Sequence, residues 1–338
     1  MPDTKVLSSN NVDEASSTAN GEIHQSEVKI PERKWEEITI NVPWGHVAGK
    51  WYGDRDKQPL LAFHGWQDNA GTFDRLIPLL PKTIPVLAID FPGHGRSSPF
   101  PPGVQYHIFW DFVPLVRRIV KHFGWEKVKL LGHSLGGAVC FMYAASFPDD
   151  VSQYISIDLY GPSIRNLKKY AAMTGKCIDK ALEYETLPES KLPCYSYDEM
   201  VSVAMDAYDG SIDRKSAEIL MIRGMNEAPK NRSKDGYFFS RDLRLKVSIL
   251  GLFSIEQVLA YAELIKCHVL NIKAVPGMKH EREEVYPMVI DAIRKNATVE
   301  YHEVPGTHHL HLTTPERIAG IISAFLLNPD AVNDSNSD

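Results

Sequence analysis

The chain has 338 residues, 43% of them hydrophobic, which suits one large α/β core with an added segment. It carries 37 lysines and arginines against 43 aspartates and glutamates, a net charge of −6, and so lacks the basic excess that binding to nucleic acid requires. The apolar run at 247–255 ends at Glu256 after nine residues, short of the roughly 20 that a membrane span needs. The composition therefore argues against a nucleic-acid partner and against an integral membrane segment.

Polar segments begin and end the chain. Residues 1–32 and 329–338 hold too few apolar side chains to offset the entropy lost on ordering, and we expect two loose tails. Residues 1–25 contain no apolar stretch of the kind found in a secretory signal. An intracellular, cytoplasmic protein is expected.

From residue 33 the sequence predicts an alternation of strands and helices. The polar–apolar alternation at 36–42 and 46–52 predicts an antiparallel hairpin. The later strands are short apolar runs, typical of parallel strands buried on both faces, at 60–63, 86–89, 128–131, 154–157, 268–274 and 298–304. Spacing near 3.6 residues predicts helices at 74–80, 110–123, 135–147, 255–265, 281–296 and 315–327.

Residues 161–240 interrupt this alternation, because they contain no strand-like apolar run and show helical patterns joined by polar turns. We expect them to form a helical cap over the carboxyl edge of the sheet. The core is then built from residues 33–160 and 241–328, and its fold class is α/β, with a mostly parallel, doubly wound sheet.

A candidate nucleophile lies between a predicted strand and a predicted helix, in the sequence Gly132-His133-Ser134-Leu135-Gly136. The Gly-x-Ser-x-Gly string alone is weak evidence for a nucleophile. Its place between a strand and a helix strengthens that evidence, because such a sharp turn holds a serine at a strained backbone angle with its hydroxyl exposed. Gly132 and Gly136 remove the side chains that would clash in such a turn. A glycine-rich turn that only packs closely is the alternative.

Serine needs a base, and the loop before Pro315 offers one. His308 follows the last predicted strand, at the sheet edge where Ser134 is also expected. His309 and His311 could indicate a metal site, but no acidic or cysteine residue stands at ligand spacing, so we expect no metal ion and no cofactor.

Two positions compete for the acid that orients the histidine. Asp158 ends the strand at 154–157, on the same sheet edge as Ser134. Glu281 is the first carboxylate after the strand at 268–274. It is too many residues beyond the end of that strand to reach the histidine unless the loop turns back. We favour Asp158, whose alternative role is to cap a turn.

An oxyanion hole requires two backbone donors, and the N–H of Leu135, directly after the serine, is one candidate. The other is the N–H of Trp66 in the turn after the strand at 60–63, where Gly65 allows close approach. His64 is interpreted as a structural hydrogen-bonding residue. The loop 90–98 follows its strand without a helix behind its glycines, so we expect it to support the site and not to bind phosphate.

Taken together, these motifs resemble the α/β-hydrolase superfamily; in chain order they are His64-Gly65, Asp90-x-Pro92-Gly93-x-Gly95-x-Ser97, Gly132-x-Ser134-x-Gly136 and Gly306-x-His308. The stretches 64–70 and 306–312 are similar, more narrowly, to the serine hydrolase-like (Kraken) group. The resemblance implies an α/β-hydrolase fold and a serine hydrolase. Some mammalian members are associated with peroxisomes, but this chain ends in Asn-Ser-Asp and not in a Ser-Lys-Leu-type address.

The position of the acid departs from the commonest pattern of the superfamily, in which it follows the penultimate strand. Haloalkane dehalogenase-type members place it one core strand earlier, as Asp158 would be. Those relatives and the epoxide hydrolases use an aspartate nucleophile, so Ser134 disfavours both of their reactions.

The predicted function is hydrolysis of a small to medium carboxylic ester by a Ser-His-Asp triad. The cap contains five of the nine methionines and several tyrosines, a composition that suits an adaptable apolar pocket, although methionine also fills gaps between helices. Thioester hydrolysis or acyl transfer by the same residues, and a non-catalytic ligand-binding protein of this fold, are the alternatives. The sequence carries no indication of oligomeric state.

Overall fold

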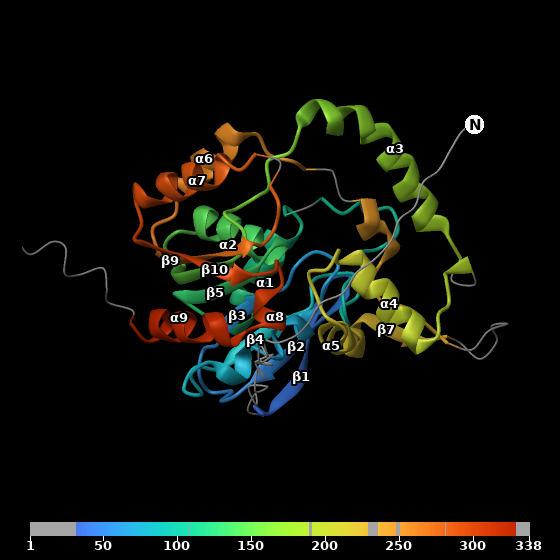
Figure 1. Cartoon of the computed structure of the whole chain (residues 1–338), viewed down its shortest axis with the longest axis horizontal. Helices are drawn as coiled ribbons and strands as arrows, with labels where there is room; N and C mark the ends of the chain where they lie inside the picture. The colour runs from blue at the N-terminus through green and yellow to red at the C-terminus, as the bar shows by residue number, and fades with distance from the viewer. Residues whose placement is uncertain are drawn as a thin grey trace, which may run out of the picture.

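A sheet of eight strands forms the centre of the described part of the chain in this computed structural model (Figure 1). The structure describes residues 32–107, 109–188, 191–228, 236–247, 251–280 and 282–328. The strands are β1 (Trp35–Val42), β2 (Gly45–Tyr52), β3 (Leu60–Phe63), β4 (Val86–Ile89), β5 (Val128–His133), β6 (Val151–Ile157), β9 (His268–Pro276) and β10 (Val299–Gly306).

The strand order is β1-β2-β4-β3-β5-β6-β9-β10, in which β2 pairs antiparallel with β1 and β4 and all other neighbours are parallel. The register aligns Phe63 with Gly132, and His133 with Ile157. Because parallel strands end at one edge, the loops after β3, β5, β6 and β10 meet there.

Helices cover both faces of the sheet, as a doubly wound fold requires. On one face lie α1 (Phe112–Phe123), α2 (Leu135–Ser146), α6 (Ile255–Ala262) and α7 (Val285–Arg294), whose apolar side chains join one core cluster (Figure 1). On the other face lie α9 (Glu316–Leu327) and the 3₁₀ turns η1 (Ala70–Phe73) and η2 (Ile77–Leu79), which join a second cluster. The α/β-hydrolase architecture expected from the motifs is confirmed.

Helix α2, which follows Ser134, is buried along almost its whole length. All of its residues from Leu135 to Ala145 are buried, because it is apolar around its full circumference. By contrast, α1 buries only one face and ends at Gly124, whose φ of 67° is the left-handed conformation common after a helix. A fully buried α2 gives the turn at Ser134 a rigid support.

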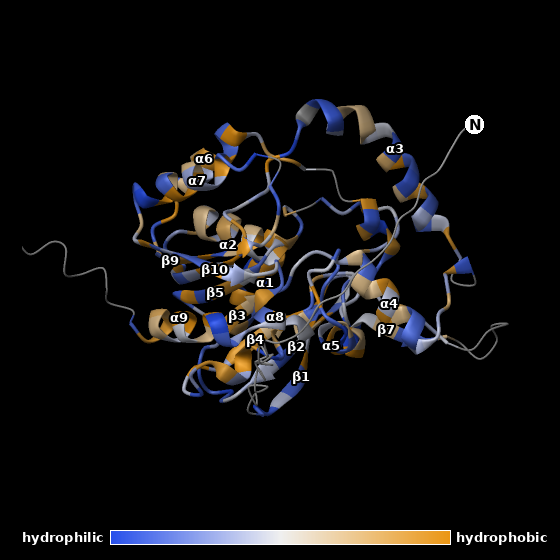
Figure 2. Cartoon of the chain, viewed as in Figure 1, coloured by the Kyte–Doolittle hydropathy of each residue, from blue (hydrophilic) through white to orange (hydrophobic). Residues whose placement is uncertain are grey.

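Between β6 and α6 the chain forms a further group of elements: α3 (Leu167–Thr186), α4 (Tyr197–Ala207), α5 (Arg214–Gly224), β7 (Met225–Glu227), β8 (Tyr237–Phe239) and η4 (Leu243–Val247). Ser196 and Asp213 cap α4 and α5 with their side chains. Apolar residues of α4 and α5 form a third cluster with Leu312 of the short helix α8 (Leu310–Thr313), which attaches this group to the core. Helix α3 arches away from the sheet, and Figure 2 shows hydrophilic and hydrophobic residues mixed along it.

The structure differs from the sequence prediction at residues 74–80 and within the segment 161–240, among other places. Residues 74–80 form no α-helix but the turn η2, because Pro78 lacks the N–H that a continuing helix would need. Strands β7 and β8 pair antiparallel inside the segment expected to hold only helices. Each has three residues, too few for an alternation to be visible in the sequence.

Most of the two predicted tails lies outside the described residues. Within the described ranges, no helix combines the length and apolar character needed to cross a bilayer.

Candidate active site

Ser134 lies at the turn between β5 and α2 with φ 50° and ψ −117°, a sparsely populated conformation for a residue with a side chain. The backbone approaches itself closely on both sides of it. A Cβ at Gly132 would lie 2.3 Å from the carbonyl of Gly136, and a Cβ at Gly136 would lie 2.0 Å from Phe63 O. Glycine is therefore required at both positions to hold the turn against β3.

His308 and Asp158 are brought together from two loops at this edge of the sheet. The Nδ1 of His308 lies 2.6 Å from Oδ2 of Asp158, and the carboxylate is buried. Because Nδ1–H donates to the carboxylate, Nε2 is the ring nitrogen that remains for other partners. The His308 side chain keeps 17% of its surface exposed.

Strand β9 and the loop after it hold Asp158 from the other side. Its Oδ1 accepts from the N–H of Ala274 at 2.8 Å, and its Oδ2 accepts from the N–H of Met278 at 2.7 Å. A Cβ at Gly277, where φ is 53°, would lie 2.6 Å from the same carboxylate, so glycine permits this approach. The donors of Ala274 and Met278 were not identified from the sequence, which gives no sign of them. Glu281, the alternative acid, lies outside the described residues.

A cavity of about 410 Å³ opens beside these residues. Both Ser134 and His308 line it, together with Gly65, Trp66 and Leu135. Trp66 comes from the loop after β3, and Leu135 is the first residue of α2. The cavity is thus lined by a hydroxyl, an imidazole and residues of the loops after β3 and β5.

Two buried histidines form hydrogen bonds with the backbone of the loops after β3 and β4. His64 donates from Nδ1 to Gly65 O at 2.7 Å, and its Nε2 accepts from the N–H of Phe91 at 3.0 Å. His94 likewise contacts Pro92 O through Nδ1 and accepts from the N–H of Gln67 at 3.3 Å. Burial lowers the pKa of each ring to about 3, so both are neutral near pH 7. The geometry matches a structural interpretation of His64.

The loop 90–98 is anchored by a buried ion-pair network. Asp90 accepts from the N–H groups of Ala70 at 2.7 Å and Arg96 at 2.9 Å. Arg223 of α5 approaches Asp90 Oδ2 to 2.5 Å and Glu37 of β1 to 2.7 Å. Arg223, which the sequence did not single out, thus connects α5 to this loop.

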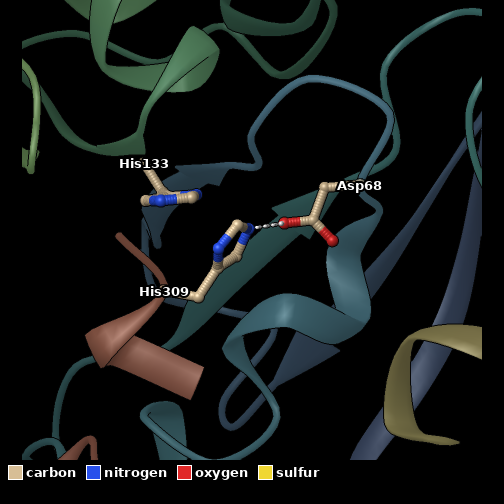
Figure 3. Close-up of side chains that lie close together, drawn as sticks. All are labelled: Asp68, His133 and His309. Atoms are coloured by element: carbon tan, nitrogen blue, oxygen red, sulfur yellow. Dashed lines mark ion pairs between the residues drawn. The ribbon is translucent and has the colours of Figure 1, made fainter. Parts of the chain in front are cut away.

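A cluster of four histidines lies at the cavity, and three of them, His133, His308 and His309, line it. The ring of His133 lies 4.5 Å from that of His308, 4.8 Å from His309 and 4.0 Å from His311, measured between centroids. Asp68 Oδ2 lies 3.9 Å from Nε2 of His309 (Figure 3). Burial raises the pKa of Asp68 to about 7. The sequence suggested no acidic partner for His309, because Asp68 is distant along the chain.

Comparison with known proteins places this geometry in a family. Residues 58–174 match the family model described as the alpha/beta hydrolase fold. A probable serine hydrolase of Drosophila melanogaster is 57% identical over 314 residues, covering 93% of this chain and 94% of that protein. The chain belongs to the serine hydrolase-like family of α/β hydrolases.

Further relatives agree with this assignment. Human serine hydrolase-like protein 2 is 33% identical over 304 residues, covering 86% of this chain and 93% of that protein. The crystal structure of a hypothetical protein from Pseudomonas aeruginosa PAO1 superposes with a TM-score of 0.74 at 30% identity, covering 86% of this chain and 99% of that one. Membership in this family supports a hydrolase activity, as the sequence motifs predicted.

Proposed function

We propose that this hydrolase cleaves small to medium carboxylic esters through an acyl-enzyme intermediate, with Ser134 as the nucleophile, His308 as the base and Asp158 as the acid. The contact of 2.6 Å between His308 Nδ1 and Asp158 Oδ2 carries the proposal, because it fixes the histidine tautomer beside a cavity that Ser134 also lines.

The reaction begins when Ser134 Oγ attacks the ester carbonyl and passes its proton to Nε2 of His308. Asp158 stabilises the imidazolium that forms. The tetrahedral intermediate then collapses, the C–O bond to the alcohol breaks, and His308 returns the proton to the departing oxygen. A water molecule, deprotonated by His308, attacks the acyl-serine and releases the carboxylic acid and free Ser134.

The negative charge on the carbonyl oxygen needs donors that are in place before the reaction. The N–H groups of Leu135 and Trp66 are the proposed donors. Leu135 lies at the N-terminal end of α2, where free N–H groups and the helix dipole favour an anion. Gly65 leaves the backbone before Trp66 free of a side chain, and a Cβ there would lie 2.9 Å from the His133 ring.

The lining of the cavity supports a substrate with apolar groups of modest size. Its apolar residues are Trp66, Phe109, Leu135, Leu159, Leu252 and Met278. Tyr170 and Tyr208 come from the cap, but the cap methionines do not line the cavity; Met200 and Met221 are buried in the cap's own core. The support for an ester therefore comes from the tyrosines and the core side chains.

Labelling by a fluorophosphonate probe tests the nucleophile. We expect the parent chain to be labelled at Ser134 and to hydrolyse p-nitrophenyl esters of short and medium chain length, and the Ser134→Ala variant to do neither. Acyl thioesters assayed in parallel separate ester from thioester hydrolysis. Turnover of esters that survives in Ser134→Ala, or labelling without turnover of any ester or thioester, would reject the proposal.

A further inference from the structure

We propose that Asp68, His133 and His309 form a binding site for a divalent transition-metal ion such as Zn²⁺. Two of these residues, His133 and His309, line the cavity, but the site does not use Ser134 or the ring of His308. The proposal is independent of the ester hydrolysis proposed above.

One strand end and two loops of the core supply the three side chains. Asp68 follows β3, His133 ends β5 and His309 follows β10, and all three residues are buried. One ligand atom from each lies within 4.8 Å of the other two, and Figure 3 shows the side chains converging. Two imidazoles and one carboxylate form a donor set that zinc commonly takes in proteins.

Two of the ligand atoms are buried without a hydrogen bond in the described part of the chain: Nδ1 of His133 and Oδ2 of Asp68. His133 Nε2 lies 2.9 Å from His308 O, and since a carbonyl only accepts, Nε2 carries the proton. The lone pair of His133 is therefore on Nδ1. The other oxygen of Asp68 accepts from the N–H of Asn69 at 3.0 Å, which fixes the carboxylate with Oδ2 toward the histidines.

The outer nitrogen of each imidazole is held as it is in protein metal sites. Histidine ligands almost always donate their second ring N–H to a nearby oxygen, which sets the tautomer and the ring orientation. His133 does so to His308 O, and Nδ1 of His309 lies 2.7 Å from Oγ of Ser211. A serine hydroxyl can accept from Nδ1–H, which leaves Nε2 of His309 free to bind the ion.

The three ligand atoms lie farther apart than in a tetrahedral zinc site, so the side chains must shift when an ion binds. Zinc bonds of about 2.0–2.1 Å in a tetrahedron place ligand atoms about 3.4 Å apart, so atoms that lie up to 4.8 Å apart must approach by up to about 1.4 Å. The separation of 3.9 Å between Asp68 Oδ2 and His309 Nε2 is already close to that value. His133 and His309 also line the cavity, which gives the ion an entry path and a fourth position open to water.

Ser211 belongs to the cap, between α4 and α5, so a bound ion would connect the cap to the core. Its Oγ also accepts from the N–H of His309 at 3.2 Å, and Thr307 Oγ1 donates to its carbonyl at 2.8 Å. An ion that orders His309 would strengthen these contacts.

Direct metal binding tests the site in the full chain, with any affinity tag removed and bound metal stripped by chelation. We expect calorimetry to show one Zn²⁺ per chain and Co²⁺ to give the visible absorption of an ion in a site of low coordination number. The substitutions Asp68→Asn and His309→Gln should each weaken Zn²⁺ binding by more than about 100-fold, and Ser211→Ala by about tenfold.

Three controls distinguish Zn²⁺ binding at this site from binding to other histidines, from catalysis and from misfolding of a variant. His302→Gln, at a half-buried histidine on β10, and Ser134→Ala should bind Zn²⁺ like the parent, whether or not esters are turned over. Melting curves recorded without metal show whether each variant folds, and Zn²⁺ should raise the Tm of the parent but not of the two ligand variants. The absence of stoichiometric binding to the parent, or binding that persists in both ligand variants, would show that the cluster is only a hydrogen-bonded group.

Discussion

At the scale of single residues, Asp158 shows how one carboxylate is prepared for its proposed role. It is 1% exposed and accepts from two backbone N–H groups in addition to the His308 ring. Its φ of 53° lies in the left-handed region, which aspartate and asparagine tolerate better than other residues with side chains. These three contacts fix the orientation of the carboxylate and, through it, the orientation of the His308 ring.

The substitution Asp158→Asn is expected to lower kcat/KM for a p-nitrophenyl ester by about 10³–10⁴. The amide keeps the shape, but it cannot stabilise the imidazolium and favours the wrong tautomer of His308. Asp209→Asn is the matched control, because Asp209 also has a positive φ, 47°, but lies exposed in the cap. Steady-state kinetics and a thermal melt of both variants give the measurement. A large loss in Glu281→Gln with little loss in Asp158→Asn would assign the acid to Glu281 instead.

At the scale of secondary-structure elements, the cap is attached to the core by side chains from α5. Arg223 is 3% exposed and pairs with Asp90, which is fully buried, and with Glu37. Asn69 donates to Leu220 O at 2.9 Å and caps η1 through its side-chain oxygen. The motif residues after β3 and β4 therefore hold the cap as well as shape the site.

Replacing Arg223 with methionine should reduce the free energy of unfolding by about 3–5 kcal/mol, because the charge of Asp90 would remain buried without its partner. Arg214→Met, on the same helix, is the matched control. Arg214 pairs with Asp198 and Glu218 on the surface, where it is 52% exposed, and its loss should cost far less because solvent screens these pairs. Urea unfolding of the two variants measures both values, and equal effects would contradict a specific role for the buried network.

Elements with strong periodicity were predictable, and those defined by contacts were not. The apolar runs of β3 to β6 and the amphipathic pattern of α1 are local properties of the sequence. The 3₁₀ turn at Ile77–Leu79 depends on one proline, and β7 and β8 depend on their pairing with each other. The position of Asp158 was predictable because it ends a strand, whereas the donors from Ala274 and Met278 depend on how a distant loop folds back.

At the scale of the whole molecule, the parallel sheet explains why motifs spread along the chain share one site. The strand order places β5 between β3 and β6, so the loops carrying Trp66, Ser134 and Asp158 are neighbours. His308 follows β10 at the sheet edge and returns across β9 to reach Asp158. The approach of Asp68 to His309 depends on the same topology, and sequence spacing could not indicate it.

The packing of the core also makes the free energy of unfolding depend on pH, because two buried histidines are held in the neutral form. His64 and His94 each use one ring nitrogen as a donor and the other as an acceptor, so a second proton would place two donors face to face. For both, burial is the main cause of a pKa of about 3, and for His94 the neighbouring His64 lowers it further. In the unfolded chain both rings regain a pKa of about 6.5.

The sign of the effect follows from these values. The stability that the neutral rings contribute is complete above about pH 6.5 and is lost as the pH falls toward 3, because only the unfolded chain takes up protons there. For each pH unit by which the solution is acidified in this window, each ring should lower the free energy of unfolding by about 1.4 kcal/mol. Urea unfolding between pH 6.5 and pH 4.5 should show this slope, reduced by about 1.4 kcal/mol per unit in His94→Gln and unchanged in His302→Gln. The glutamine variant keeps an acceptor for the N–H of Gln67, so a slope equal to that of the parent would mean that His94 becomes protonated without opening the fold.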